Sequence, residues 1–143
     1  MLVTQDTRVG GRDYQEDVVK VVTLADGRVL AWVCDGHGGD RCAKFISSFI
    51  VEHGDKYLRK NTDLMGLVVQ ANAAWTQVCL DALGLFQPPT DEADRKLLFD
   101  NVLGPDVVQK YEQDGLGSGT TIAIVLVDGK QRLSLIHISE PTR

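Results

Sequence analysis

The sequence predicts an α+β fold in which helices pack on an antiparallel sheet. Segments 18–24, 28–34 and 120–127 are rich in β-branched and other apolar residues, a composition typical of strands. Asp-Gly pairs at 26–27 and 128–129 follow two of these segments and are typical of hairpin turns. The predicted order, strand, strand, helix, helix, strand, favours an antiparallel sheet with packed helices over a βαβ repeat.

The helices are predicted from the spacing of their apolar residues. The first begins after Asp40, which is placed to act as an N-cap. Its core-facing residues are Ala43, Ile46, Phe49 and Ile50. The second helix spans about residues 63–85 and ends before the Pro-Pro pair in 87–90. Shorter helical segments are expected over 91–102 and 107–111, and the glycine-rich run after Cys34 is expected to end the second strand.

Composition excludes several classes of protein. The chain has 143 residues, with 15 Lys and Arg against 20 Asp and Glu, and a formal net charge of −5. The acidic balance argues against a nucleic-acid partner, because such partners are held largely by basic side chains. No stretch approaches the roughly 18 apolar residues of a membrane span. The first residues show no secretory signal, so we expect a cytoplasmic or nuclear location.

The three cysteines do not predict a disulfide framework or a zinc site. An odd, sparse set of cysteines is typical of reduced thiols in the cytosol or nucleus. Cys34, His37 and Cys42 lie near one another in sequence, but a fourth ligand at structural-zinc spacing is absent.

Three carboxylates beside glycine turns predict a metal site. Glu16 and Asp17 immediately precede the first predicted strand, and Asp35 follows the second. Paired strands of a hairpin bring such side chains close together, where they would repel one another without a cation. Mg²⁺ and Mn²⁺ prefer oxygen ligands, and Gly36 would let a metal approach the backbone carbonyl. Two such ions can clamp a phosphoryl group and activate a water.

Two further residues fit phosphate chemistry. Arg12, four residues before Glu16, is suited to binding a phosphate through two hydrogen bonds. His37 is placed to donate a proton to a leaving oxygen. Taken singly, each of these residues is more often an ordinary surface or turn residue. The joint pattern, with its order and spacing, favours the functional interpretation.

That pattern resembles the metal-dependent serine/threonine phosphatases of type 2C. Three motifs carry the resemblance: Gly-Arg-Asp-Tyr-Gln-Glu-Asp at 11–17, Val-Cys-Asp-Gly-His-Gly-Gly at 33–39, and Gly-Ser-Gly-Thr-Thr-Ile-Ala at 117–123. It covers residues 9 to about 128. The resemblance implies a four-layer αββα sandwich, two antiparallel sheets flanked by helices, of which this chain would be the N-terminal half.

The resemblance also implies a binuclear Mg²⁺ or Mn²⁺ centre. Asp35 would bridge the two ions, and the Gly36 carbonyl would be a ligand. Glu16 would support one ion directly and Asp17 would hold its waters. Asp114 is the candidate ligand for a third ion.

The implied reaction is hydrolysis of phosphoserine or phosphothreonine in a protein substrate. Arg12 would bind the substrate phosphate, and a metal-bridging water would attack phosphorus in line. His37 would protonate the leaving hydroxyl. The alternative is a non-catalytic pseudophosphatase that acts as a regulatory or binding module. We expect the full-length protein to be a monomer.

The last residues do not continue the type 2C pattern. After Val127 that pattern leads to Gly-Asp-Ser-Arg and later to Asp-Gly and Asp-Asn segments with further metal-binding aspartates. The segment 133–143 instead matches, at all its positions, the translation of a transposase-type sequencing adapter. We therefore interpret 1–132 as a partial phosphatase domain and 133–143 as an artefact. On this interpretation the chain by itself would be inactive and poorly soluble.

Overall fold

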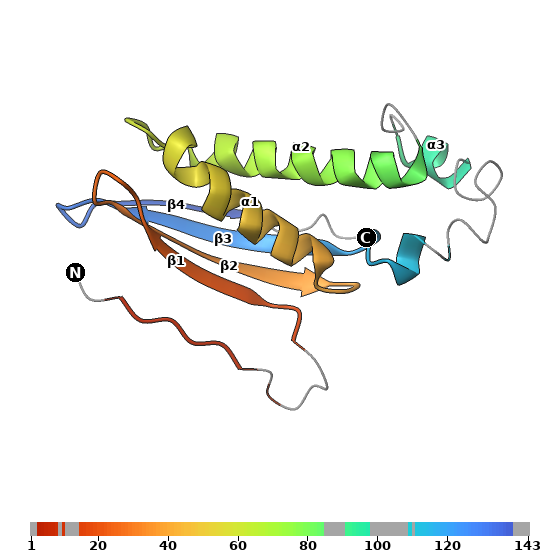
Figure 1. The fold of residues 1–143 in the computed structure, drawn as a ribbon, viewed down its shortest axis with the longest axis horizontal. Coiled ribbons are helices and arrows are strands. Elements are labelled where there is room, and N and C mark those ends of the chain that lie inside the picture. Colours follow the sequence, from red (N-terminus) through yellow and green to blue (C-terminus); the bar gives the residue numbers. More distant parts are fainter. Residues whose placement is uncertain are drawn as a thin grey trace.

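A four-stranded antiparallel sheet carries two long helices on one of its faces (Figure 1). The computed structural model describes residues 3–8, 10, 15–84, 91–97, 109 and 111–138. Arg12, the segments 98–102 and 107–108 of the predicted short helices, and residues 139–143 lie outside this part. In chain order the elements are β1 (Val18–Thr23), β2 (Val29–His37), α1 (Arg41–Tyr57), α2 (Leu64–Leu83), α3 (Glu92–Leu97), β3 (Gly119–Val127) and β4 (Leu133–Ile138).

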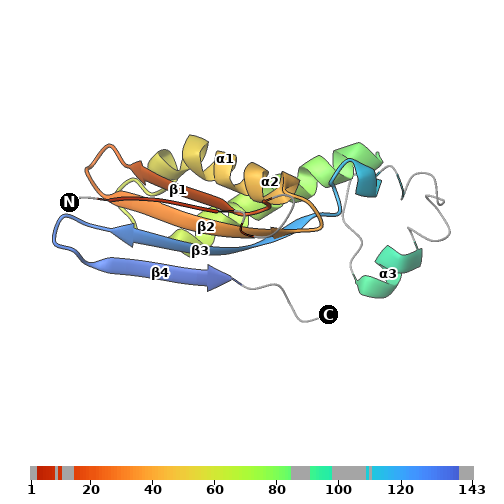
Figure 2. The ribbon, with the colours of Figure 1, turned by 90° about the horizontal axis from the view of Figure 1, so that it is seen from below.

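The predicted α+β class and antiparallel pairing are confirmed. The strands lie in the order β1-β2-β3-β4, and every neighbouring pair is antiparallel. The turn at Asp26-Gly27 closes on a hydrogen bond from the Leu24 amide to the Arg28 carbonyl (2.8 Å). After β3 the Asp128 amide donates to the Arg132 carbonyl (3.1 Å), which forms the second hairpin. Figure 2 shows the four strands side by side with α1 and α2 behind them.

The predicted end of the second strand is wrong. β2 continues through Asp35 and Gly36 to His37, because these residues pair with Thr121, Thr120 and Gly119 of β3. The chain turns only at the next two glycines. Gly38 has φ 68° and Gly39 has φ 117°, conformations that residues with a Cβ rarely adopt. The partner strand, which is distant in sequence, therefore sets the length of β2.

The core lies between the sheet and the two helices. Alternate strand residues point to this side, and Leu30, Trp32 and Cys34 of β2 are almost fully buried. The predicted apolar face of α1 is confirmed, since Ala43, Ile46 and Ile50 are buried and Phe49 packs against the core. In α2 the buried residues include Leu64, Leu67, Val68, Ala71 and Trp75. Inside this core the Trp32 indole N–H donates to the Ser47 hydroxyl (2.9 Å), so both buried polar groups are satisfied.

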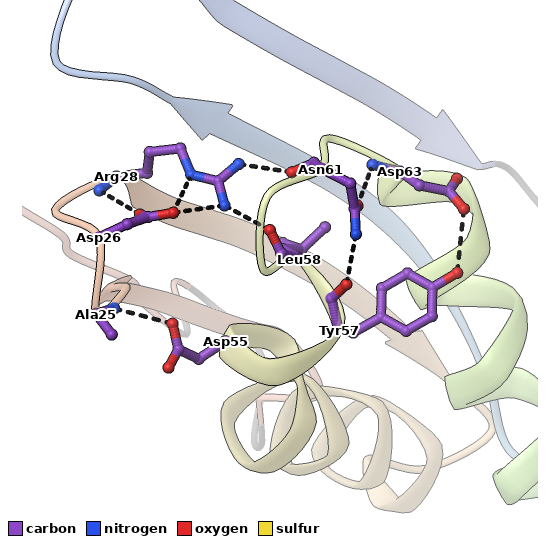
Figure 3. Close-up of polar contacts among 8 residues, drawn as sticks. All are labelled: Ala25, Asp26, Arg28, Asp55, Tyr57, Leu58, Asn61 and Asp63. Carbon is purple, nitrogen blue, oxygen red and sulfur yellow. Dashed lines mark hydrogen bonds and ion pairs between the residues drawn. The ribbon is translucent and has the colours of Figure 1, made fainter.

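Arg28 joins the first hairpin to the end of α1 (Figure 3). Its guanidinium donates to the carbonyls of Leu58 (2.5 Å) and Asn61 (2.6 Å), where the helix has ended and carbonyls lack helical partners. Asp26 accepts a further hydrogen bond from Arg28 Nε (2.8 Å), and this contact lowers the pKa of the Asp26 carboxyl. The hairpin and the loop between α1 and α2 are thereby fixed to each other.

The second face of the sheet is only lightly covered. Val33 is 45% exposed, and Leu133 and Leu135 are 68% and 67% exposed. Residues 3–8 run along this side of the sheet (Figure 1), and a groove of about 400 Å³ lies between them and the strands. This face therefore leaves several large apolar side chains open to solvent.

Leu133–Ile138 forms β4 and pairs with β3 from Val127↔Leu133 to Ile122↔Ile138. Exposed and half-buried residues alternate along β4, a pattern typical of a strand at the edge of a sheet. The interpretation of 133–143 as an adapter translation concerns the origin of these residues and stays a prediction. Within the part of the chain that the structure describes, no helix is long and apolar enough to cross a membrane.

Replacing Arg28 by Met should lower the free energy of unfolding by about 1–3 kcal/mol, because carbonyls at the end of α1 lose charged donors. The Arg28 side chain is only 14% exposed, so water replaces these donors poorly. Arg8→Met is the matched control, because that side chain is 86% exposed and pairs with the nearby, exposed Asp6. Urea denaturation measures both, and equal midpoints for the two variants would contradict the assignment.

Candidate metal centre

The predicted carboxylates lie at one end of the sheet, where β1 begins and β2 ends. The β1–β2 register places Val18 opposite Cys34. Continued by one and two residues, this register sets Asp17 opposite Asp35 and Glu16 opposite Gly36. Positions directly opposite on antiparallel strands have Cβ atoms about 4.5–5.5 Å apart. The hairpin thus brings Glu16 and Asp17 beside Asp35 and Gly36.

Gly36 makes this approach possible. A Cβ atom at this position would lie 2.5 Å from the Glu16 carbonyl oxygen and 3.3 Å from the Ala43 Cβ of α1. The first of these contacts is a backbone clash, which no rotamer change relieves. Glycine is therefore required for the start of β1, the end of β2 and α1 to meet as they do.

The carboxylates are divided between the two faces of the sheet. Asp35 is exposed between the buried Cys34 and the buried Gly36, so it belongs to the lightly covered face, as does the exposed Asp17. Glu16 is half-buried, and its Cβ lies beside Gly36 near α1. Among the described residues, no three His, Cys, Asp or Glu side chains form a group that could hold a metal ion. The structure brings the predicted carboxylates Glu16, Asp17 and Asp35 to one edge, and the described residues form no three-ligand group there.

The donor set fits a hard cation and does not fit zinc. Asp17 and Asp35 offer only oxygen, and two carboxylates on opposite strand positions favour a bound cation. The nearest thiol is Cys34, and burial raises its pKa from 9.0 to about 11. A thiol that stays protonated at neutral pH is a poor metal ligand. Mg²⁺ and Mn²⁺ match these residues by donor type.

His37 is the last residue of β2 and pairs with Gly119. It is half-buried, and its Nε2 atom is shielded from solvent. The strand alternation puts its side chain on the same face as that of Asp35. Since the register of β2 on β3 fixes its backbone, His37 has a defined position beside the carboxylates.

The loop before β3 is held against the start of α1. The Ser118 hydroxyl accepts a hydrogen bond from the Cys42 amide (3.0 Å) and donates to the Gly115 carbonyl (2.5 Å). Arg41 Nη1 donates to the Asp114 carbonyl (2.7 Å). Asp114 itself is exposed, and pairing of His37 with Gly119 sets its loop at the same end of the sheet as Asp35.

The prediction that the Asp40 side chain caps the first helix is wrong. Asp40 occupies the N-cap position, but its side chain makes no capping hydrogen bond. Its carboxylate instead forms an ion pair with Lys44, one turn along the helix (2.5 Å). Ser118 caps the helix in its place, from 76 residues along the chain. Sequence reasoning missed Ser118 and Arg41, and the Gly-Ser-Gly-Thr-Thr motif was the only signal that pointed to this loop.

A separate groove of about 490 Å³ lies at the opposite end of the sheet, beside Arg28, Lys60 and Arg132. Its basic side chains suggest an anion site, but Arg28 already donates to two carbonyls and Arg132 pairs with Asp128 (2.6 Å). This end of the sheet is therefore organised as a structural junction, and the carboxylate end remains the better candidate site.

No protein-family model matches this chain, and no curated protein matches it significantly. The resemblance to type 2C phosphatases therefore rests on the three sequence motifs.

Substituting Ser118 by Ala should destabilise the protein by about 0.5–2 kcal/mol, because an N-terminal amide of α1 loses its cap. Asp40→Ala should change the free energy of unfolding by no more than about 0.5 kcal/mol, because only an exposed ion pair is removed. Chemical denaturation of both variants gives the comparison. The reverse ranking would show that Asp40 is the functional cap.

The free energy of unfolding should fall as pH rises from 9.0 towards about 11, because Cys34 stays protonated in the folded protein and ionises in the unfolded chain. The contribution is fully present below pH 9.0 and is lost as pH passes the folded-state pKa. Burial also raises the pKa of Tyr111, and this adds to the fall in the free energy of unfolding at higher pH. Denaturation series on both sides of pH 9.0 should show a shallower slope in Cys34→Ala. An unchanged slope in Cys34→Ala would show that Cys34 is not the source of the fall in the free energy of unfolding.

Proposed function

We propose that this chain belongs to a metal-dependent protein serine/threonine phosphatase of the type 2C family. The observation that carries the proposal is the close approach of Glu16 to Gly36. It sets Asp17 opposite Asp35 at the edge where His37 ends β2. The described residues of the three motifs, 15–17, 33–39 and 117–123, lie in or beside the strands β1, β2 and β3.

The carboxylates would hold two Mg²⁺ or Mn²⁺ ions. Asp35 would bridge them, Glu16 and Asp17 would support one ion directly and through its waters, and the Gly36 carbonyl would be a further ligand. Ions held by these residues would supply positive charge to the phosphate and would activate a water. Asp114 would serve a third ion.

Two other residues would handle the substrate. Arg12 would bind the phosphate of phosphoserine or phosphothreonine through its guanidinium fork. His37 would donate a proton to the leaving hydroxyl, which avoids release of an unstable alkoxide. Its half-buried position on a paired strand supports this role, because a proton donor must be held in place.

The lightly covered face of the sheet supports the proposal of a four-layer αββα sandwich. Val33 exposes apolar surface there, opposite the face that α1 and α2 cover. In a four-layer αββα sandwich a second antiparallel sheet packs on such a face. The ligands in hand are few for ions that prefer six oxygen neighbours, so the 143-residue chain itself should bind metal weakly and hydrolyse little.

The alternative is a pseudophosphatase that binds partners without catalysis. The absence of a three-ligand group among the described residues is the observation that favours it. The presence of Asp35 and His37 together in their family positions favours the enzyme, because a binding module needs neither.

The test is hydrolysis of a phosphothreonine peptide by the protein expressed from the natural transcript that encodes residues 1–132. We expect phosphate release that needs Mn²⁺ and stops with a chelator, because the water must be activated by metal. His37→Gln should lower kcat by about 10²–10⁴-fold through loss of the proton donor. Asp35→Asn should abolish the reaction together with metal binding.

An exposed substitution of the same kind, Asp81→Asn in α2, serves as the control and should leave kcat unchanged. Metal binding without hydrolysis would support the pseudophosphatase. Hydrolysis that persists in Asp35→Asn would contradict the proposed centre.

A further inference from the structure

A turn of two glycines links His37 to helix α1. Gly38 has φ 68° and Gly39 has φ 117°, and α1 begins at Arg41. Two consecutive glycines are a weakly restrained link, because glycine loses more conformational freedom on folding than any other residue. The pairing of His37 with Gly119 restrains this link from the strand side. The helix side needs a second restraint if His37 is to keep one position.

Ser118 supplies the second restraint from the residue next to Gly119. Its hydroxyl accepts a hydrogen bond from the Cys42 amide in the first turn of α1 (3.0 Å). The same hydroxyl donates to the Gly115 carbonyl (2.5 Å), so it acts as acceptor and donor at once. Two neighbouring residues therefore hold both ends of the link, since Gly119 pairs with His37 and Ser118 holds the start of the helix.

The two-glycine turn also packs directly on Ser118. A Cβ atom at Gly38 would lie 3.5 Å from the Ser118 Cα, and one at Gly39 would lie 3.6 Å from the Ser118 Cβ. Ser118 is 6% exposed, so water is a poor substitute for its hydroxyl. Ser118 therefore acts on the backbone that leaves His37, whereas the His37 side chain lies on the lightly covered face with Asp35.

We propose that Ser118 is a positioning residue for His37. This inference rests on the proposed function, in which His37 donates the proton to the leaving hydroxyl. A proton donor must lie within hydrogen-bond reach of the leaving oxygen, and a displacement of about 1 Å can cost about 10²-fold in rate. Loss of the Ser118 hydroxyl should free the two-glycine turn and the end of β2 with it. Asp35 pairs with Thr121 inside the sheet and should keep its place.

The test compares two substrates with the full-length protein expressed from the natural transcript. In a phosphothreonine peptide the leaving alkoxide is strongly basic and needs a proton, whereas p-nitrophenyl phosphate releases a stable phenolate that needs little proton donation. Ser118→Ala should lower kcat for the peptide about 10–100-fold and should keep kcat for p-nitrophenyl phosphate within about twofold of the wild type. His37→Gln should show the same selectivity. Asp40→Ala is the matched control at the same helix end, because the Asp40 side chain makes no capping hydrogen bond, and it should match the wild type on both substrates.

A second measurement uses the 143-residue chain and needs no activity. NMR relaxation of backbone amides reports fast motion of individual residues. In Ser118→Ala the amides of Gly38 and Gly39 should become more mobile than in the wild type, and in Asp40→Ala they should not. If Ser118→Ala does not fold, Ser118→Cys keeps a side chain of similar shape and offers only a weak sulfur acceptor. The same selectivity between the two substrates is then expected of Ser118→Cys.

The other outcomes separate the two proposals. Equal losses on both substrates in Ser118→Ala would show that Ser118 serves the fold or the metal centre, and an undiminished rate on the peptide would show that pairing with Gly119 alone holds His37. Unchanged mobility of Gly38 and Gly39 would also contradict the positioning role. Each of these results overturns the inference and leaves the proposed function intact. If the wild type releases phosphate from neither substrate, the proposed function is wrong and the positioning role falls with it.

Discussion

The close approach between the Glu16 carbonyl and Gly36 is the constraint on which the candidate site depends. Only a residue without a Cβ allows the start of β1, the end of β2 and the Ala43 end of α1 to share this space. Once the strands meet there, strand alternation directs Asp35 to the open face and buries Cys34 in the core. The apolar core thus lies on one face of the sheet at this end, and the Asp17 and Asp35 carboxylates lie on the other.

Contacts between distant segments stabilise both ends of the sheet. At one end Arg28 of the first hairpin supplies donors to carbonyls at the end of α1 (Figure 3). At the other end Ser118, next to β3, supplies the acceptor for the start of α1. The residues that directly precede β2 and β3 therefore supply hydrogen-bond partners at the two ends of α1, which fixes its position along the sheet. Asp35 and His37 lie at the end that Ser118 completes.

The sequence predicts what depends on local pattern and misses what depends on distant partners. The hairpins, the antiparallel pairing and the core faces of both long helices follow from Asp-Gly turns and apolar spacing, and all are observed. β2 was expected to end at Cys34 because glycines usually interrupt strands, yet pairing with Gly119–Thr121 carries it to His37. Asp40 looked like a cap by position, but the capping oxygen belongs to Ser118. For the site, the hairpin predicts that Glu16, Asp17 and Asp35 come close together. The position of Glu16 on the other face of the sheet was not predicted, because it depends on strand register and on the packing of α1.

The most direct test is the Mn²⁺ affinity of Gly36→Ala, measured from the electron paramagnetic resonance signal of free Mn²⁺. Gly129→Ala is the control, because a Cβ there would meet nothing within 4 Å. If the approach of β1 to β2 builds the metal site, Gly36→Ala should weaken Mn²⁺ binding at least about tenfold, as loss of a supporting contact around metal ligands commonly does. The control should match the wild type. Equal Mn²⁺ affinities for Gly36→Ala and the wild type would contradict the account.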